Sequence, residues 1–242
     1  MKQAETGERE AEGYSRKEPC LVDAKAVRYG RDGHYDVISA FIKSVRGSDV
    51  DAALYWLHLM LEGGEDPEFI ARRLIILASE DIGLADPNAL LQATAAAQAL
   101  AHVGLPEAAF HLSQATIYLA VAPKSNAVTQ AMAAARAAVA DGPNPVVPGH
   151  LRDAHYAGAK TIGHGEGYRY AHDAPYHVVA QQYFPDDVDP IALYQPTEQG
   201  SEAGLTERLA WIDEIMGRGG RVKNLYGPDG KKISYYQINA TF

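Results

Sequence analysis

The sequence predicts a mainly α-helical fold, in which a helical bundle is followed by a long Gly/Pro/Tyr-rich loop region and a final helix. Three observations predict it. Apolar residues recur at helical spacing between residues 36 and 141, Asp-Pro pairs and glycines mark helix ends there, and the last part of that range is rich in alanine.

Two short helices are expected first, with almost no connection between them. The first stops at Gly47, where a left-handed terminating residue costs least. Ser48 is expected to cap the second, which ends at Gly63. Because the turn between them is so short, the two helices should form an angular pair or hairpin.

The third predicted helix contains the acidic pair Glu80-Asp81. Asp66-Pro67 provides an N-cap followed by proline at the first helical position, and the apolar stripe that begins there ends at Asp81. Two acids after an apolar run are also typical of the catalytic strand of a P-loop ATPase, but that strand needs a G-x-x-x-x-G-K-[ST] loop, and the sequence contains none. We therefore interpret Glu80-Asp81 as a helix-end pair that holds local geometry.

Small side chains dominate the next three predicted helices. These helices start at Pro87, at Pro106 and near Ser125, and the last one ends at Gly142. The stretches "ATAAAQALA" and "AMAAARAAVA" offer smooth faces that bury little area per residue. Such helices gain from a second packing partner, so self-association is a reasonable hypothesis.

Beyond residue 141 the sequence changes character. A rigid connector, "DGPNPVVPG", precedes a short helical piece near residues 151–161, then loops and a final amphipathic helix through Leu205 and Leu209. We expect a mobile leader over 1–23, a helical oligomerisation domain over 24–141, a connector, loop region and last helix packed on the bundle over 142–216, and a basic tail of uncertain structure, with a weak hairpin signal, over 217–242.

Composition narrows the classes of function. The net charge of −9 argues against broad, sequence-independent nucleic-acid binding by this chain alone, although the tail after Met216 is basic. The single cysteine, Cys20, excludes an intramolecular disulfide and favours a reducing compartment. Since no apolar run approaches the roughly 20 residues of a membrane span, we expect a cytoplasmic protein with no membrane partner.

No catalytic or metal-binding arrangement stands out. His150 and His155, like His172 and His177, lack the i, i+4 spacing that places two imidazoles on one helical face, and no H-E-x-x-H occurs. No G-x-S-x-G nucleophile elbow is present either. We predict no catalytic, cofactor-binding or metal-binding residues, and a helical hydrolase that uses the acidic pair or the histidines is the weakest alternative.

Two motifs are candidates for contact with a partner. In "YRYAHD" Arg169 could stack on a base, but we favour a structural role in which the tyrosines pin the loop and Arg169 pairs with an acid such as Asp173. In "APKSNA" Lys124 lies at a helix start, against the positive end of the helix dipole, which suggests a contact, while Ser125 or Asn126 caps the helix. The candidate contact residues are Arg46, Lys124, Ser125, Asn126, Arg169, Tyr170, His172 and Asp173.

Several stretches, taken in order, resemble the C-terminal, post-ATPase region of replication-associated recombination protein A (RarA, also called MgsA), a family related to the Werner-helicase-interacting ATPase. They cover about residues 24–216. The matching stretches are "HYDVISAFIKSVRGSDVDAALYWLHLMLEGGEDPEFIARRLIILASEDIGLADP" (34–87), "IYLAVAPKSNAV" (117–128), "VPGHLRDA" (147–154), "GYRYAHD" (167–173) and "YQPTEQG" (194–200).

The resemblance implies a bundle similar to the C-terminal oligomerisation domains of clamp loaders. It also implies that family members are AAA+ ATPases of DNA replication, recombination and repair at stalled forks. They are expected to form homotetramers, to associate with single-strand-binding protein and DNA, and to be nucleoid-associated in the cytoplasm. ATP and magnesium are expected only in an upstream ATPase core, so the resemblance carries no nucleotide site over to this sequence.

We therefore predict a non-catalytic homo-oligomerisation module, in which the alanine-rich helices between Asp86 and Asp141 pack across subunits. The alternative is a module that binds DNA or single-strand-binding protein through Arg46, Lys124, Arg169 and the basic tail. Its affinity for DNA would fall steeply with salt if phosphates are contacted.

Overall fold

The computed structural model describes residues 31–156 and 163–218, and within these ranges its regular secondary structure is entirely helical. The prediction of a mainly α fold is therefore confirmed. The α-helices are α1 (Arg31–Arg46), α2 (Val50–Glu62), α3 (Pro67–Leu77), α4 (Asn88–Val103), α5 (Ala108–Val121), α6 (Ala127–Asp141) and α7 (Glu202–Ile215). Shorter turns are the π-helical η1 (Ala78–Ile82) and the 3-10 turns η2 (Gly83–Ala85), Gly149–Leu151, Ala171–Asp173 and Pro175–His177. The leader predicted over 1–23 and the hairpin predicted in the tail lie outside the described residues.

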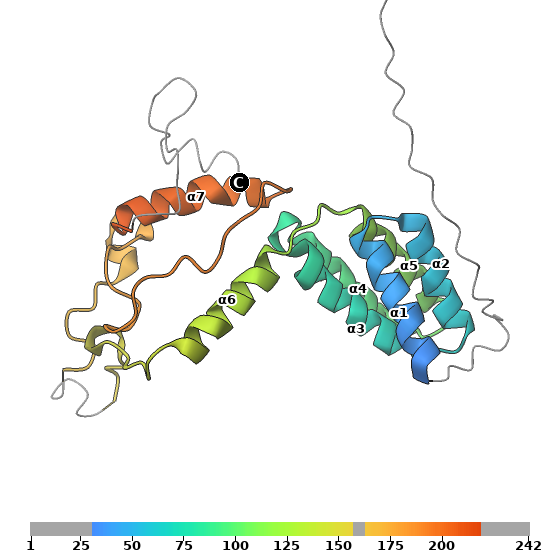
Figure 1. The fold of residues 1–242 in the computed structure, drawn as a ribbon, viewed down its shortest axis with the longest axis horizontal. Helices are drawn as coiled ribbons and strands as arrows, with labels where there is room; N and C mark the ends of the chain where they lie inside the picture. Colours follow the sequence, from blue (N-terminus) through green and yellow to red (C-terminus); the bar gives the residue numbers. More distant parts are fainter. Residues whose placement is uncertain (1–30, 157–162, 219–242) are drawn as a thin grey trace, which may run out of the picture.

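Helices α1 to α5 form one bundle (Figure 1). Within it α1 packs on α2, α2 on α5, α3 on α4, and α4 on α5. Burying one large apolar side chain contributes about 1.5–3 kcal/mol, so the stability of the bundle comes mainly from its core. The completely buried side chains of that core include Phe41, Leu57, Ile70, Leu74, Leu112 and Leu119.

The starts of α3 and α4 follow the predicted signals, whereas the start of α2 does not. Asp66 and Asp86 each accept a hydrogen bond of 3.0 Å from the backbone N–H two residues later. For α2 the predicted cap, Ser48, is wrong: Asp49 is the cap and accepts a hydrogen bond of 2.9 Å from the N–H of Ala52. Ser48 has a φ of 61°, whereas a capping residue adopts an extended conformation.

The acidic pair Glu80-Asp81 lies at the end of a helix, as interpreted from the sequence. The stripe that begins with Ile70, Leu74 and Leu77 is buried and continues to Asp81, which is only 8% exposed. The last turn widens into the π-helical η1, a local change of register that is often associated with function. Asp81 is therefore a buried polar group at the edge of the core.

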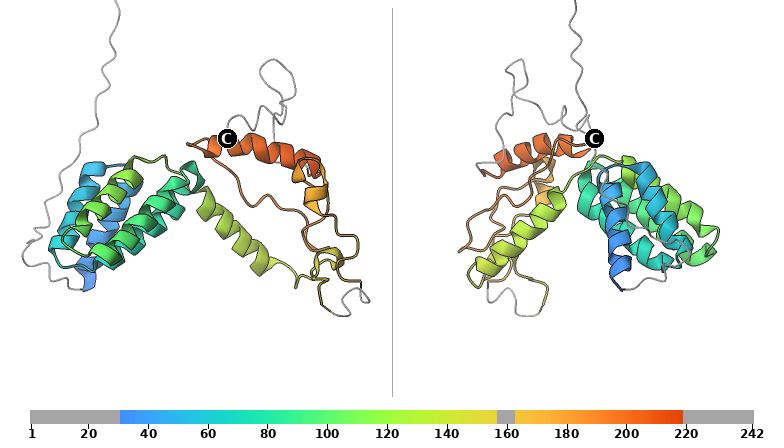
Figure 2. Two further views of the ribbon diagram at one scale, coloured as in Figure 1. Left: turned by 180° about the vertical axis from the view of Figure 1, so that it is seen from behind. Right: turned by 45° about the vertical axis from the view of Figure 1, so that its right-hand side comes forward.

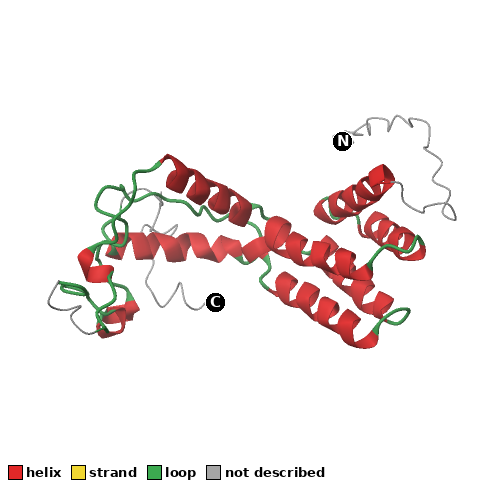
Figure 3. Ribbon diagram, turned by 90° about the horizontal axis from the view of Figure 1, so that it is seen from below, coloured by secondary structure: helices red, strands yellow, loops and turns green. Residues whose placement is uncertain are grey.

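Helices α6 and α7 form an arm (residues 127–218) that extends away from the bundle (Figure 1, Figure 2). Both helices start next to the bundle and run outward, and the loop region lies at the far end of the arm. Residues 193–200 return from the far end to the start of α7. In the view from below, the two arm helices lie toward one side of the molecule and the bundle helices toward the other (Figure 3).

The loop region is anchored on α7. The ring of Tyr176 lies edge-on to the ring of Trp211, with 5.5 Å between their centroids. Tyr176 and His177 have φ values of 62° and 56°, a left-handed conformation that non-glycine residues adopt rarely. The contact with α7 is therefore made by a tightly turned backbone.

The short helix predicted near residues 151–161 is wrong for residues 152–156, which are not helical. Only the 3-10 turn Gly149–Leu151 forms, because the neighbouring groups bond across the loop instead of along a helix. Arg152 Nε donates to the Val147 carbonyl at 2.7 Å, and the N–H of Gly165 donates to the Gly149 carbonyl at 2.9 Å. The rest of that predicted helix, 157–161, lies outside the described residues.

Candidate functional site

Polar side chains of the bundle and of the arm meet where α6 and α7 begin. They line a cavity of about 520 Å³. Four of the predicted contact residues are brought together there. The lining residues are Arg46, Glu80, Asp81, Lys124, Ser125, Asn126, Thr129 and Thr197, and we define these residues, together with Gly200 and Glu202, as the junction.

Glu202 is the buried centre of the junction, with an exposure of 0%. Its carboxylate accepts hydrogen bonds from Ser125 Oγ at 2.6 Å, from Tyr194 OH at 2.9 Å, and from the N–H and Oγ1 of Thr197 at 3.0 and 2.5 Å. A buried carboxylate is tolerated when its lone pairs are satisfied in this way. These bonds join the start of α7 to the returning segment and to the residues just before α6.

The pKa of Glu202 reflects two opposing effects. Burial raises the pKa of this carboxyl, but the hydrogen bonds from Ser125, Thr197 and Tyr194 lower it, and the net pKa lies below the ordinary value. Burial, together with the hydrogen bond to Glu202, raises the pKa of Tyr194. At neutral pH Glu202 is therefore charged and Tyr194 protonated, which is the combination that their hydrogen bond needs.

The returning segment touches the bundle at Gly200. Its φ is 49°, and a Cβ atom there would lie 2.1 Å from the carbonyl oxygen of Ala85, so only glycine fits. The N–H of Ser201 donates to the same carbonyl at 2.8 Å, and the N–H of Ser125 donates to the Asp81 carbonyl at 2.8 Å. The residues just before both arm helices, α6 and α7, are thus bonded to the turns that follow α3.

Arg46 joins the end of α1 to the same turns. Its Nε donates to Asp81 Oδ1 at 2.6 Å and its Nη2 to Asp81 Oδ2 at 3.2 Å, a bidentate pair, while Glu80 lies 3.6 Å from Nη2. The hydrogen bond to Asp81 raises the pKa of Arg46. Arg46 therefore satisfies the buried Asp81, although about half of its own side chain is exposed.

Lys124 bonds to the end of α5, which precedes it, rather than to the start of α6, which follows it. Its Nζ donates to the carbonyls of Ala120 and Ala122, at the end of α5, at 2.9 and 2.7 Å, and to Ser48 Oγ at 3.1 Å. A cation at a helix C-terminus is favourable, so the expectation that Lys124 is electrostatically misplaced is wrong. Burial lowers the pKa of Lys124, and the charge of Asp81 opposes that effect.

The start of α6 is fastened by its polar residues. Of the two predicted caps, Asn126 occupies the N-cap position without a side-chain capping bond, and Ser125 Oγ accepts a hydrogen bond of 3.2 Å from the N–H of Ala127. Asn126 Oδ1 accepts from Gln130 Nε2 at 3.0 Å, and Thr129 Oγ1 donates to the Glu80 carbonyl at 3.1 Å. Because Ser125 bonds both the helix start and Glu202, it couples the direction of α6 to that of α7.

The other predicted contact residues lie in the loop region of the arm, apart from the junction. Arg169 donates to the Ala180 carbonyl at 3.1 Å, where the sequence suggested an acid such as Asp173. Tyr170 is 55% exposed, and its ring centroid lies 5.1 Å from that of His172, which in turn lies 4.9 Å from the His177 ring. A role for this group in binding a partner stays a prediction.

Sequence reasoning missed the residue at the centre of the junction. Glu202 looked like any acid in the first turn of a helix, and Tyr194 and Thr197 looked like loop residues. The available signal was the stretch "YQPTEQG", which ends two residues before Glu202 and carries part of the family resemblance.

Two further findings concern the described ranges only. They contain no group of three or more His, Cys, Asp or Glu side chains arranged to hold a metal ion. Their helices include none that is both long and apolar enough to cross a bilayer.

Fold and site together define an all-helical domain that uses its clustered polar residues to hold its own parts in place. The chain belongs to the family described as MgsA AAA+ ATPase C terminal, whose model matches residues 47–213. Helices α2 to α5, the junction apart from Arg46, and most of the arm fall within that range. The family resemblance inferred from the sequence is therefore confirmed.

The relatives of this chain are longer proteins. It is 60% identical over 197 residues to an uncharacterised AAA domain-containing protein of Mycobacterium tuberculosis, 46% over 184 residues to replication-associated recombination protein A of Escherichia coli, and 44% over 160 residues to ATPase WRNIP1 of Dictyostelium discoideum. These alignments cover 81%, 76% and 66% of this chain, but 44%, 41% and 18% of the relatives. The chain thus spans less than half the length of each.

Proposed function

We propose that this chain is the homo-oligomerisation module of an AAA+ ATPase similar to replication-associated recombination protein A, acting in DNA replication, recombination and repair at stalled forks. Family membership and the name of the Escherichia coli relative support the cellular process. The observation that carries the oligomerisation role is the apolar surface that α4, α5 and α6 leave exposed.

Helix α6 is the strongest part of this surface. Ala127, at its first position, is its only buried residue, and Met132 and Val139 are 55% and 81% exposed. Its sequence, AVTQAMAAARAAVAD, carries one cation, Arg136, so alanine and valine form most of its surface. A helix of this length is marginal in water without tertiary packing. A second copy that covers α6 would supply that packing.

Helix α5 adds an apolar ridge. Phe110, Ile117 and Val121 share one helical face and are 78%, 41% and 65% exposed. A shallow groove of about 170 Å³ lies beside them, between α4 and α5, and alanines make up much of its lining. Ridges that pack into such grooves are the usual means by which helices of two subunits interdigitate.

We expect these surfaces to assemble a homotetramer, since oligomers of one chain close by symmetry. The junction would then set the direction in which each subunit presents α6. ATP and magnesium would bind in the ATPase core of the full-length protein, which the assembled modules hold in an array near DNA and single-strand-binding protein. Binding of DNA or single-strand-binding protein by this chain itself stays the alternative, and Arg46 and Lys124 are already bonded within the chain.

Light scattering on the purified chain tests the proposal. We expect an oligomer for the wild type, and a shift toward monomer for Val139→Asp combined with Met132→Asp, because a charge buried in an apolar interface is strongly unfavourable. The matched control is Tyr55→Asp on α2, which is 64% exposed but lies outside the alanine-rich helices, and it should leave the mass unchanged. A wild-type chain that stays monomeric at micromolar concentrations would overturn the proposal.

A further inference from the structure

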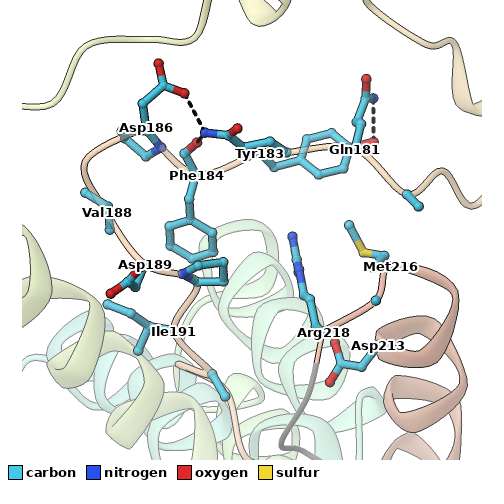
Figure 4. A pocket seen from close by; sticks show the side chains of 16 residues that line it. Gln181, Tyr183, Phe184, Asp186, Val188, Asp189, Ile191, Asp213, Met216 and Arg218 are labelled. Atoms are coloured by element: carbon cyan, nitrogen blue, oxygen red, sulfur yellow. Dashed lines mark hydrogen bonds between the residues drawn. The ribbon is translucent and has the colours of Figure 1, made fainter.

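A second cleft, of about 690 Å³, lies in the arm, apart from the junction. It is formed by the loop 180–192 and by the end of α7 with the three residues that follow this helix. Figure 4 shows the side chain of Arg218 extending into the space between Phe184 and Met216. The cleft thus lies at the point where the chain leaves α7.

The lining of this cleft combines apolar and acidic groups. Phe184, Val188, Ile191 and Met216 provide apolar surface, and the lining also contains three carboxylates and a single cation. The carboxylates are Asp186, Asp189 and Asp213, and the cation is Arg218. Such a lining fits a segment that carries both cations and aromatic or aliphatic side chains.

The chain itself turns into the cleft after α7. Gly217 adopts a left-handed φ of 65°, and the N–H of Arg218 donates to the Asp213 carbonyl at 2.8 Å, which closes the helix. The guanidinium of Arg218 then lies 6.0 Å from the centroid of the Phe184 ring, at the limit of cation–π attraction. Arg218, three residues beyond the end of α7, thus already makes the contact that the lining favours.

The residues that follow have matching chemistry. The segment 219–242 contains the single acid Asp229, so its net charge is positive. Its cations are Arg221, Lys223, Lys231 and Lys232, and its aromatic residues are Tyr226, Tyr235, Tyr236 and Phe242.

We propose that this cleft binds the chain's own C-terminal segment, residues 219–242. The net negative charge of the lining attracts the cations of the segment, and its aromatic side chains pack on the apolar lining. Because the segment is tethered at the edge of the cleft, its effective concentration there is on the order of millimolar, so even a weak contact is occupied. Occupation would also cover apolar surface that could otherwise attract other chains.

A spin label on the segment tests this in the chain of 242 residues. The single cysteine, Cys20, is changed to Ser, and Ser234→Cys carries the label. The methyl signal of Met216, inside the cleft, should lose most of its intensity, whereas that of Met60, 1% exposed in the bundle core, should keep it. High salt and the pair Lys231→Glu and Lys232→Glu should each restore the Met216 signal, because they remove the charge attraction.

Two outcomes would overturn the proposal. One is a Met216 signal that the label does not affect. The other is a loss of signal only in mixtures of labelled and unlabelled chains, which would mean that a second copy supplies the segment. The two proposals can be tested separately. Met216 reports on the cleft, and Met132 on α6 reports on the surface proposed for oligomerisation.

Discussion

The bundle and the arm are held in place by different forces. The apolar core draws on every helix from α1 to α5, so hydrophobic burial, which is strong but non-directional, stabilises the bundle. Few residues of the junction and arm are buried, and several of these are polar. The apolar ones are Ala127, Pro148, Val179, Ala210 and Trp211, and the polar ones are Asp81, Ser125, Glu202 and Asp213. Hydrogen bonds contribute only about 0.5–1.5 kcal/mol each, but they depend strongly on angle.

The stability of the chain and the directions of α6 and α7 therefore depend on different regions. The bundle supplies a rigid base, and the bonds of Glu202, Ser125 and Ala85 decide where α6 and α7 point. An assembly that must hold large domains at fixed positions needs both properties. A substitution in the bundle core should therefore leave the directions of α6 and α7 largely intact, and a substitution in the junction should leave the stability of the bundle largely intact.

The largest effect is expected in the bundle core. Phe41→Ala removes a completely buried ring, and we expect a loss of about 3–5 kcal/mol in the free energy of unfolding, measured in urea. Trp211→Ala in the arm should leave the main unfolding transition in place, because this ring packs on the loop region and not in the bundle core. If both changes lowered the same midpoint equally, bundle and arm would be one cooperative unit.

The second effect concerns the arm alone. Glu202→Gln removes the charge that accepts bonds from Ser125, Thr197 and Tyr194, and we expect local opening of the junction to become easier by about 1–3 kcal/mol. Amide hydrogen exchange should accelerate at residues 125–129 and 197–203 and stay unchanged in α3. Glu207→Gln, on an exposed position of the same helix, is the matched control and should change neither. Equal acceleration of exchange throughout the bundle would contradict the idea that the junction opens independently of the bundle core.

Lowering the pH should reproduce part of the junction opening expected for Glu202→Gln. The pKa of Glu202 is lower in the folded chain than the ordinary value of 4.5, so its contribution is complete above that value and is lost as pH falls through the folded pKa. Hydrogen exchange at the junction, corrected for its intrinsic pH dependence, should therefore accelerate below about pH 4.5. In Glu202→Gln this acid response should be absent. A response of equal size in the variant would assign it to other carboxyl groups.

The smallest expected effect is a difference in unfolding free energy between substitutions of two arginines, Arg46 and Arg72. Arg46 bonds the nearly buried Asp81, and its replacement by Ala should cost about 1 kcal/mol in unfolding free energy, since a buried carboxylate loses its partner. Arg72 pairs with Asp66 and Glu68 in the open, and Arg72→Ala should change the same quantity by about 0–0.5 kcal/mol. Equal losses would show that the burial of Asp81 does not matter.

The helices of the bundle were largely predictable, and the junction was not. Asp66 and Asp86 mark their helix starts within two residues, and Gly63 and Gly104 follow the ends of α2 and α4 directly. For α7 the same periodicity misplaced the buried face: Leu205 and Leu209 are only half-buried, whereas Ala210, Trp211 and Asp213 are buried. The neighbours of α7 are loop residues and one turn of the bundle. The spacing of apolar residues within α7 gives no information about which residues these are.

The sequence by itself determined the helical class, most helix boundaries, the family and the alanine-rich surfaces, because periodicity, caps and composition act between residues a few positions apart. Only the tertiary structure decided which polar residues matter. Ser125 and Glu202 are 77 positions apart, and Arg46 and Asp81 are 35 apart, yet each pair shares one short hydrogen bond or more. Such a bond requires the whole chain to fold, since it exists only after the bundle has brought its distant partners together.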